Sequence, residues 1–229
     1  MSGFAFDPSI LAFLDDLSAN NNRTWFEENK QRFKTDVQGQ LVAIVEALAP
    51  KLADISPHII ADPRPNGKTI FRIYRDVRFS KDKRPYKEHA ACHFRHASEQ
   101  DVHGPGFYFH IDREGIVLGA GVWAPPSDDL RAIRQHIVDQ PKAWAALKAE
   151  NGLGILLDGF EADRLKTAPR GFPKDHEHVE DLKRKSFVVS QRLPREAVTG
   201  PDLIDSVAKA YCSCAPANAF ICTALGLPF

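Results

Sequence analysis

The sequence has few of the residues and segments that indicate a metal centre, a disulfide framework or a membrane span. Its 229 residues include four cysteines and one methionine. Cys212 and Cys214 are separated by one residue, not by the two of a zinc knuckle or redox pair, so reduced thiols are expected. No apolar run approaches the ~20 residues of a membrane-spanning helix, and no membrane contact is expected. The N-terminus also lacks a secretory leader, so we predict a cytoplasmic protein.

Motifs of the common nucleotide and acyl-transfer enzymes are missing as well. The glycines of 104–106 and 119–121 match neither a phosphate loop, nor a dinucleotide fingerprint, nor a nucleophile elbow. The cofactor is therefore unknown from the sequence. Lys and Arg number 30, as do Asp and Glu, whereas a dedicated nucleic-acid binder is usually strongly basic.

This neutral total conceals one basic segment. Residues 64–95 contain ten Lys or Arg against three acids, a local excess of seven positive charges. A segregated field of this kind attracts anions, and it indicates a class of partner rather than a fold. The region is therefore the first candidate for a functional site.

Periodicity predicts an α+β protein of one domain over residues 1–229, with a mainly antiparallel sheet covered by helices from both chain ends. Thr24 and Glu27 resemble a capping box that opens a helix ending near Pro50. Strands are expected at 70–79, 90–95, 106–112, 116–123 and 186–192, with a hairpin connector at 113–115. Two short helices, 201–214 and 216–225, close the chain. Consecutive strands without intervening helices favour antiparallel pairing.

Within the expected strand 70–79, alternate side chains point to opposite faces. Arg72, Asp76 and Arg78 fall on one face, where two guanidiniums can hold an anion while Asp76 orients one of them. Arg75 falls on the apolar face, so either a carboxylate meets it or a bulge turns it outward. A solvated face with local Arg–Asp pairs is the alternative. Lys83 adds a further charge in the following turn.

The strand 106–112 contains a second polar row. Alternation places Tyr108, His110 and Asp112 on one face, and a histidine beside a carboxylate suits proton transfer near neutral pH. Gly119 and Gly121 in the partner strand leave room above that face, which makes a pocket floor. A hydrogen-bonded polar face beside solvent is the alternative, as is half of a metal site, although no metal ligands are assigned.

A third, weaker candidate is the loop from Leu165 to Ser186, which mixes cations, histidines and turn residues in the manner of a substrate-binding loop. An ordinary surface loop is the alternative. The following residues make up the predicted site: for ligand binding Arg72, Arg75, Arg78, Lys83, Tyr86, Tyr108 and Lys185, and for catalysis His110 and Asp76.

The segment from Arg72 to Tyr86 reads R-I-Y-R-D-V-R-F-S-K-D-K-R-P-Y. It resembles the signature R-x-x-R-D-x-R-F-x-x-D-K-x-x-Y of an uncharacterised bacterial family known as domain of unknown function 2461. Residues 22–30, 108–123, 169–172 and 185–187 are similar to other shared blocks of that family. The resemblance implies a family member without supplying a reaction, and a shared pattern of Arg, Asp, Lys and Tyr favours a site over a solvated face.

Three functions remain open at this point. The first is a site, enzymatic or not, for a small molecule bearing a phosphate or carboxylate, held by the arginines with His110 transferring a proton. The second is a structural or protein-interaction domain with an internal Arg–Asp network. The third is a nucleic-acid-binding module, in which Phe71, Tyr74 and Phe79 stack on bases.

Overall fold

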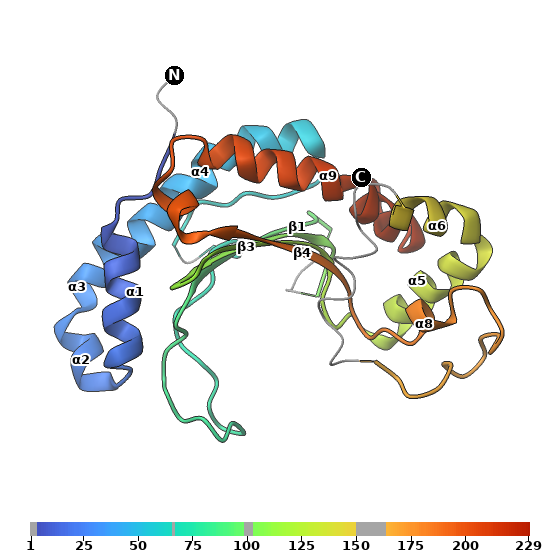
Figure 1. Ribbon diagram of the computed structural model, residues 1–229, viewed down its shortest axis with the longest axis horizontal. Coiled ribbons are helices and arrows are strands. Elements are labelled where there is room, and N and C mark those ends of the chain that lie inside the picture. Colours follow the sequence, from blue (N-terminus) through green and yellow to red (C-terminus); the bar gives the residue numbers. More distant parts are fainter. Residues whose placement is uncertain (1–3, 66, 99–102, 150–163) are drawn as a thin grey trace.

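A four-stranded antiparallel sheet with helices packed on one of its faces forms the centre of the protein (Figure 1). The structure is a computed structural model that describes residues 4–65, 67–98, 103–149 and 164–229. One helix from the N-terminal part of the chain, α4 (Gln40–Ile55), and one from the C-terminal part, α9 (Leu203–Ala224), cover the sheet. The predicted α+β class with helices from both chain ends is confirmed.

The sheet has the strand order β1-β2-β3-β4. The strands are β1 (Ala90–Arg95), β2 (Gly106–Asp112), β3 (Gly115–Val122) and β4 (Phe187–Pro194). The predicted hairpin joins β2 to β3, pairing Tyr108 with Gly119 and Asp112 with Gly115. Four of the five expected strands are thus present, because each combines an alternating pattern with a turn signal.

The helices flank the sheet as well as cover it (Figure 1). Beyond one end of the strands, beside the β2–β3 turn, lie α1 (Ser9–Ala19), α2 (Arg23–Glu28), α3 (Lys30–Arg32) and a π-helical segment η1 (Phe33–Gly39), which leads directly into α4. Beyond the other end of the strands lie α5 (Ser127–Asp139), α6 (Pro141–Ala149) and α8 (Val179–Leu182). A short 3₁₀ helix, η4 (Arg195–Thr199), connects β4 to α9. None of the described helices combines the length and the apolar composition needed to cross a membrane.

The hydrophobic core lies between the sheet and the helices α4 and α9. In β2 the side chains of Phe107, Phe109 and Ile111 are fully buried, whereas Tyr108 and His110 between them are only partly buried. Alternation therefore directs the apolar row of β2 into the core and the polar row to the opposite face of the sheet. The polar row is left on the face that none of the described helices covers.

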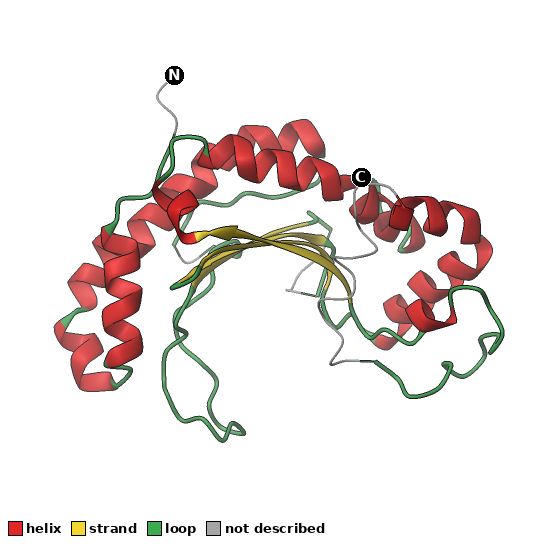
Figure 2. Cartoon of the chain, in the orientation of Figure 1, coloured by secondary structure: helices red, strands yellow, loops and turns green. Residues whose placement is uncertain are grey.

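The chain between Tyr74 and Tyr86 forms an arm that extends from the uncovered face of the sheet (Figures 1 and 2). The predicted strand at 70–79 is wrong: only two isolated bridges form here, Ile70 with Cys92 and Tyr74 with Tyr86. Beyond Tyr74 the arm is fastened by its own charged side chains, as described below. The alternating aromatic and basic residues of this segment resemble a strand pattern, but the segment forms no continuous ladder with a neighbouring strand.

Helix boundaries depart from expectation at three places. Asn22, not Thr24, caps α2 by accepting the Trp25 N–H at 3.0 Å. Helix α4 continues past Pro50, and the two expected C-terminal helices form one helix, α9, with Pro216 inside it. A proline removes one helical hydrogen bond, but buried residues on both sides of each proline hold the helix against the core.

Candidate functional site

The uncovered face of the sheet bears a cavity of about 420 Å³, which we name the sheet chamber. Its floor is built from β2, β3 and β4, and its wall from the residues that precede and begin β1. The following residues line it: Phe71, Lys87, His89, His93, Gly106, Tyr108, His110, Val117, Gly119, Ala120, Gly121, Trp123, Val188 and Ser190. Mostly apolar walls with a few converging polar groups are typical of small-molecule sites.

The glycines of β3 create the room in this chamber, as the sequence predicted. Gly119 is paired with Tyr108, and a Cβ at Gly119 would lie 3.3 Å from the Tyr108 Cβ. Gly121 has a φ of +119°, and a Cβ there would meet the Phe187 carbonyl oxygen at 1.9 Å. A larger residue at Gly121 would therefore distort β3 against β4.

Four polar side chains form a hydrogen-bonded chain along the chamber floor. The His110 ring lies with Nδ1 3.0 Å from the Tyr108 hydroxyl and Nε2 3.3 Å from Asp112 Oδ2. Arg192, which β4 places opposite Val117, donates to both oxygens of Asp112 at 2.8 and 2.9 Å. The order Tyr108–His110–Asp112–Arg192 thus extends from the chamber to the sheet edge.

The surroundings set the protonation states of the Tyr108, His110 and Asp112 side chains in this hydrogen-bonded chain. Burial by itself would raise the pKa of Asp112, but hydrogen bonds from Arg192 and from the Glu114 backbone hold it at about 2. Burial lowers the pKa of His110, against the opposing effect of Asp112. Burial also raises the pKa of Tyr108 to about 12. At neutral pH the chain therefore contains a carboxylate, a neutral imidazole and a neutral phenol.

These states assign the proton of each hydrogen bond. Ionised Asp112 only accepts, so His110 carries its proton on Nε2 and donates it to the carboxylate. The Nδ1 of a neutral imidazole then accepts, and the Tyr108 O–H donates to it. If His110 takes up a proton, Nδ1–H donates to the Tyr108 oxygen instead, and the phenolic proton becomes free to point at a bound group.

Two further histidines on the chamber wall are also neutral. Burial lowers the pKa of His89 to about 4, with smaller contributions from His110 and Lys87, and its ring lies 4.9 Å from that of His110. Burial likewise lowers the pKa of His93 to about 4, and its buried Nδ1 has no hydrogen-bond partner among the described residues. No group of three metal-ligating residues occurs in the described ranges.

Lys87 is the cation of the chamber. Its ammonium lies over the ring of Phe71, 5.0 Å from the ring centroid, and no carboxylate of the described residues pairs with it. Burial lowers the pKa of Lys87, and the charge of Arg72 lowers it further. A half-buried ammonium near another cation is disfavoured by lost hydration and by like-charge repulsion. A bound anion would offset both effects, so such a group attracts an anion.

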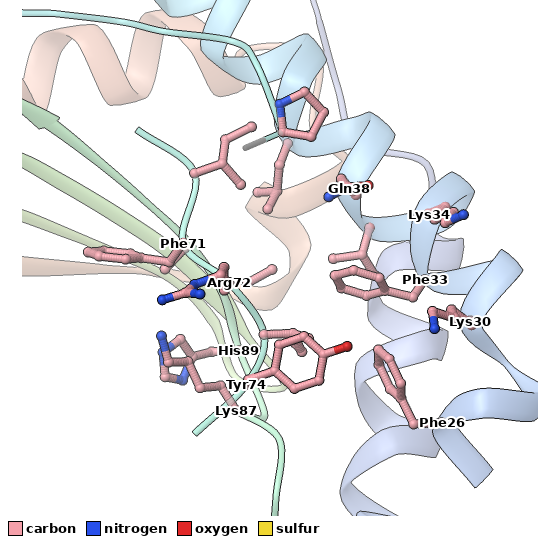
Figure 3. Close-up of a pocket in the computed structure, with 17 residues that line it drawn as sticks. Phe26, Lys30, Phe33, Lys34, Gln38, Phe71, Arg72, Tyr74, Lys87 and His89 are labelled. Carbon is pink, nitrogen blue, oxygen red and sulfur yellow. The ribbon is translucent and has the colours of Figure 1, made fainter. Parts of the chain in front are cut away.

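On the other side of Phe71, Lys87 and His89 lies a second cavity of about 330 Å³, which we name the outer cleft. Figure 3 shows Arg72, Lys87 and His89 on one wall and Lys30, Lys34 and Gln38 on the helical wall opposite. Neither cavity has an Asp or a Glu among its described lining residues. The predicted site is therefore divided: Arg72 lines the outer cleft, and Tyr108 and His110 line the chamber.

The remaining arginines of the signature are paired within the arm. Arg75 meets Asp82 at 2.8 Å, so a carboxylate rather than a bulge accommodates its charge. Arg78 pairs with Asp76 at 2.7 Å, and hydrogen bonds from Arg78 hold the pKa of Asp76 at about 2. Lys83 donates to the Val77 carbonyl at 3.0 Å. These side chains line neither cavity, and the arm is shaped by them.

Two more predicted site residues lie outside the cavities. Tyr86 is buried and stacks on Phe26, with ring centroids 4.1 Å apart. Its backbone N–H donates to Asn21, which fastens the base of the arm to the N-terminal helices. Lys185 is exposed and lines neither cavity. Tyr86 therefore holds the arm in place rather than facing a ligand.

The sequence alone did not single out Lys87, Arg192, Lys30 or Lys34. Lys87 directly follows the signature and is one of the ten basic residues of 64–95, and that basic segment was the available signal. Arg192 reaches Asp112 only through the pairing of β3 with β4, which no local pattern reveals. Lys30 and Lys34 belong to the predicted helix, and only the packing of that helix beside the arm brings them to the site.

The fold and the site define an α+β protein with two cationic cavities beside one face of an antiparallel sheet. The family described as "Conserved hypothetical protein (DUF2461)" matches residues 9–220. The chain belongs to this family, as its resemblance indicated. No protein with a curated description matches it, and neither does any solved structure.

Proposed function

We propose that the sheet chamber binds a small molecule that carries a phosphate or a carboxylate. The observation that carries this proposal is Lys87, a half-buried ammonium without a carboxylate partner among the described residues. It lies on the wall of a cavity that has no acid among its described lining residues. The apolar walls take the body of the ligand. Tyr108, which is hydrogen-bonded to His110, contacts the ligand.

The Tyr108–His110–Asp112 chain supports acid–base chemistry on such a ligand. Tyr108 is the group that touches the ligand, and His110 exchanges the phenolic proton through Nδ1. Asp112, held by Arg192, keeps the imidazole in one tautomer and stabilises the imidazolium. A reaction that moves one proton at the bound molecule is the enzymatic form of this proposal.

Ligand binding is tested by thermal shift and calorimetry with phosphorylated and carboxylated metabolites, which stabilise only the protein that binds them. Lys87→Gln should weaken a hit roughly 10- to 100-fold, the loss of one hydrogen bond to a charged group. Lys83→Gln is the matched control, because Lys83 lies on the arm and donates to a backbone carbonyl. Equal effects of the two substitutions would contradict the proposal.

One observation favours a second function, binding of single-stranded nucleic acid. Phe79 on the arm is 95% exposed, and Arg78 lies across its ring with the guanidinium carbon 5.8 Å from the centroid. An exposed aromatic among cations is the arrangement on which bases stack. Gel-shift titration at low and high salt, with Phe79→Ala as the variant, tests it, and no retardation at low salt would exclude it.

The internal Arg–Asp network that was the structural alternative is present in the arm. It is compatible with an anion site, because the paired arginines are not the residues that line the cavities.

The single domain over residues 1–229 and the cytoplasmic location stay predictions from the sequence.

A further inference from the structure

The outer cleft, unlike the sheet chamber, is lined by the π-helical segment η1. Four of its lining residues, Phe33, Lys34, Val37 and Gln38, belong to the π-helical segment η1. A π-helix is rare in proteins and occurs frequently at functional sites, because its wider turn redirects side chains that an α-helix would place elsewhere. Here the segment presents one apolar pair and one polar pair to the same cavity.

The charges of the cleft are all of one sign. Lys30 and Lys34 line the helical wall and Arg72 and Lys87 the wall opposite, and no described lining residue is acidic (Figure 3). Lys30 pairs with Glu27 at 3.0 Å outside the cleft. For Lys34, Arg72 and Lys87 no carboxylate partner occurs among the described residues. Cations that line one cavity without an acidic residue among its described lining favour an anion in that cavity.

The interior of the cleft is aromatic. Phe33 packs against buried Phe26, with ring centroids 5.4 Å apart, and Tyr74 lies at the edge of Phe26 at 6.2 Å. Tyr74 also lies 5.6 Å from the Tyr86 ring, yet the residue remains 54% exposed, so part of it is open to solvent. Its hydroxyl points towards the helical wall (Figure 3). An exposed ring in a cavity offers a planar ligand a surface for stacking.

We propose that the outer cleft is a separate binding site for a planar aromatic anion, meaning an aromatic ring that carries a phosphate or a carboxylate. Tyr74 and Phe33 contact the ring. Lys34 and Arg72 hold the anionic group from opposite walls, and Lys87 adds its charge from the partition between the cavities. The Gln38 amide is placed to hydrogen-bond polar atoms of the ring. The volume of about 330 Å³ falls at the small end of ligand pockets, which suits a single ring system with one anionic group.

The test is titration calorimetry with phenyl phosphate as the probe, compared with inorganic phosphate and with phenol. The cleft should bind phenyl phosphate at least tenfold more tightly than either half. Lys34→Gln and Tyr74→Leu should each weaken binding five- to 50-fold. The matched controls are Lys51→Gln on the same continuous helix and Phe79→Leu on the arm, which line neither cavity and should leave affinity within twofold.

The failure of this inference is distinguishable from a failure of the proposed function. If Tyr108→Phe weakens phenyl phosphate binding while Lys34→Gln and Tyr74→Leu leave it unchanged, the probe occupies the sheet chamber. That result would overturn the outer site and support the chamber. No measurable binding of phenyl phosphate at millimolar concentration, or equal binding of inorganic phosphate, would also overturn the outer site. Circular dichroism of each variant shows that its fold is intact.

Discussion

The arm and the wall between the two cavities come from one basic stretch of sequence, yet they treat their charges in opposite ways. In the arm, Arg75 and Arg78 are neutralised by Asp82 and Asp76, which lie a few residues away along the chain. At the wall, Lys87 and Arg72 face cavities without a described acidic residue. Carboxylates nearby in the sequence pair with the arginines of the arm, whereas the cations of the wall line cavities with no acidic residue among their described lining residues.

The largest expected difference between the two regions is in acid stability. His89 and His93 have folded pKa values of about 4 against 6.5 for the free side chain. The unfolded chain therefore binds protons first, and stability is complete above pH 6.5 and falls as the pH decreases towards 4. By pH 4.5 each histidine should cost on the order of 2 kcal/mol.

Urea unfolding at pH 7.0 and pH 4.5 measures this loss. His89→Gln and His93→Gln should each reduce the difference between the two pH values. Asp76→Asn in the arm is the control: its folded pKa of about 2 lies below the ordinary 3.8, so its contribution is lost only below about pH 4. If both histidine variants keep the pH dependence of the unaltered protein, then His89 and His93 do not have the lowered pKa values on which this prediction depends.

The second difference is in the pH dependence of anion binding to the chamber. Protonation of His110 frees the Tyr108 O–H to donate to the anion, and the anion in turn favours the imidazolium. Affinity should therefore rise as the pH falls towards the lowered pKa of His110, by up to about tenfold per pH unit. Asp112, Arg192, His89 and Lys87 also act on this ring.

Calorimetry between pH 8 and pH 5.5 in buffers of different ionisation enthalpy counts the protons taken up. Tyr108→Phe keeps the ring and removes the hydroxyl, so proton uptake should disappear. His89→Gln separates the contribution of the neighbouring imidazole. Uptake that is identical in Tyr108→Phe and in the unaltered protein would show that this chain does not couple protons to the ligand.

A third comparison concerns the free energy of unfolding without ligand. Lys87→Met removes a half-buried charge that has no counter-ion among the described residues, and stability should rise by a few tenths to about 1 kcal/mol. Arg75→Met leaves the Asp82 carboxylate with Arg84 as its remaining arginine partner, and stability should fall. Urea unfolding midpoints at pH 7 measure both changes in stability. If both substitutions changed stability in the same direction, the charges of the arm and of the wall would not differ in the way proposed.

The smallest effect is expected at the exposed end of the arm. Arg78 and Asp76 form an ion pair in which both side chains are mostly in water, with exposed fractions of 77% and 60%. Such pairs contribute little, so Arg78→Gln should leave the urea unfolding midpoint almost unchanged. Its effect on ligand affinity should be equally small. A loss of affinity comparable to that of Arg72→Gln would place the arm in the site.

The sequence predicted correctly those elements whose signals lie within a few neighbouring residues. The β2–β3 hairpin follows from alternation with a short connector, and the Tyr108–His110 row follows from the same alternation. The strand expected at 70–79 failed because alternation describes a side-chain pattern and does not supply a neighbouring strand. The helices continue through Pro50 and Pro216 because burial on both sides outweighs one lost hydrogen bond.

The sequence by itself determined the family, the α+β class, the polar row of β2 and the glycines that leave space beside it. Each of these depends on residue types at short spacing. Only the tertiary structure decided which cations are neutralised, because pairing depends on where the chain folds back and not on composition. Arg72 was a candidate ligand-binding residue from the sequence, whereas Lys87 became one only because the fold places it beside two cavities with no Asp or Glu among their described lining residues.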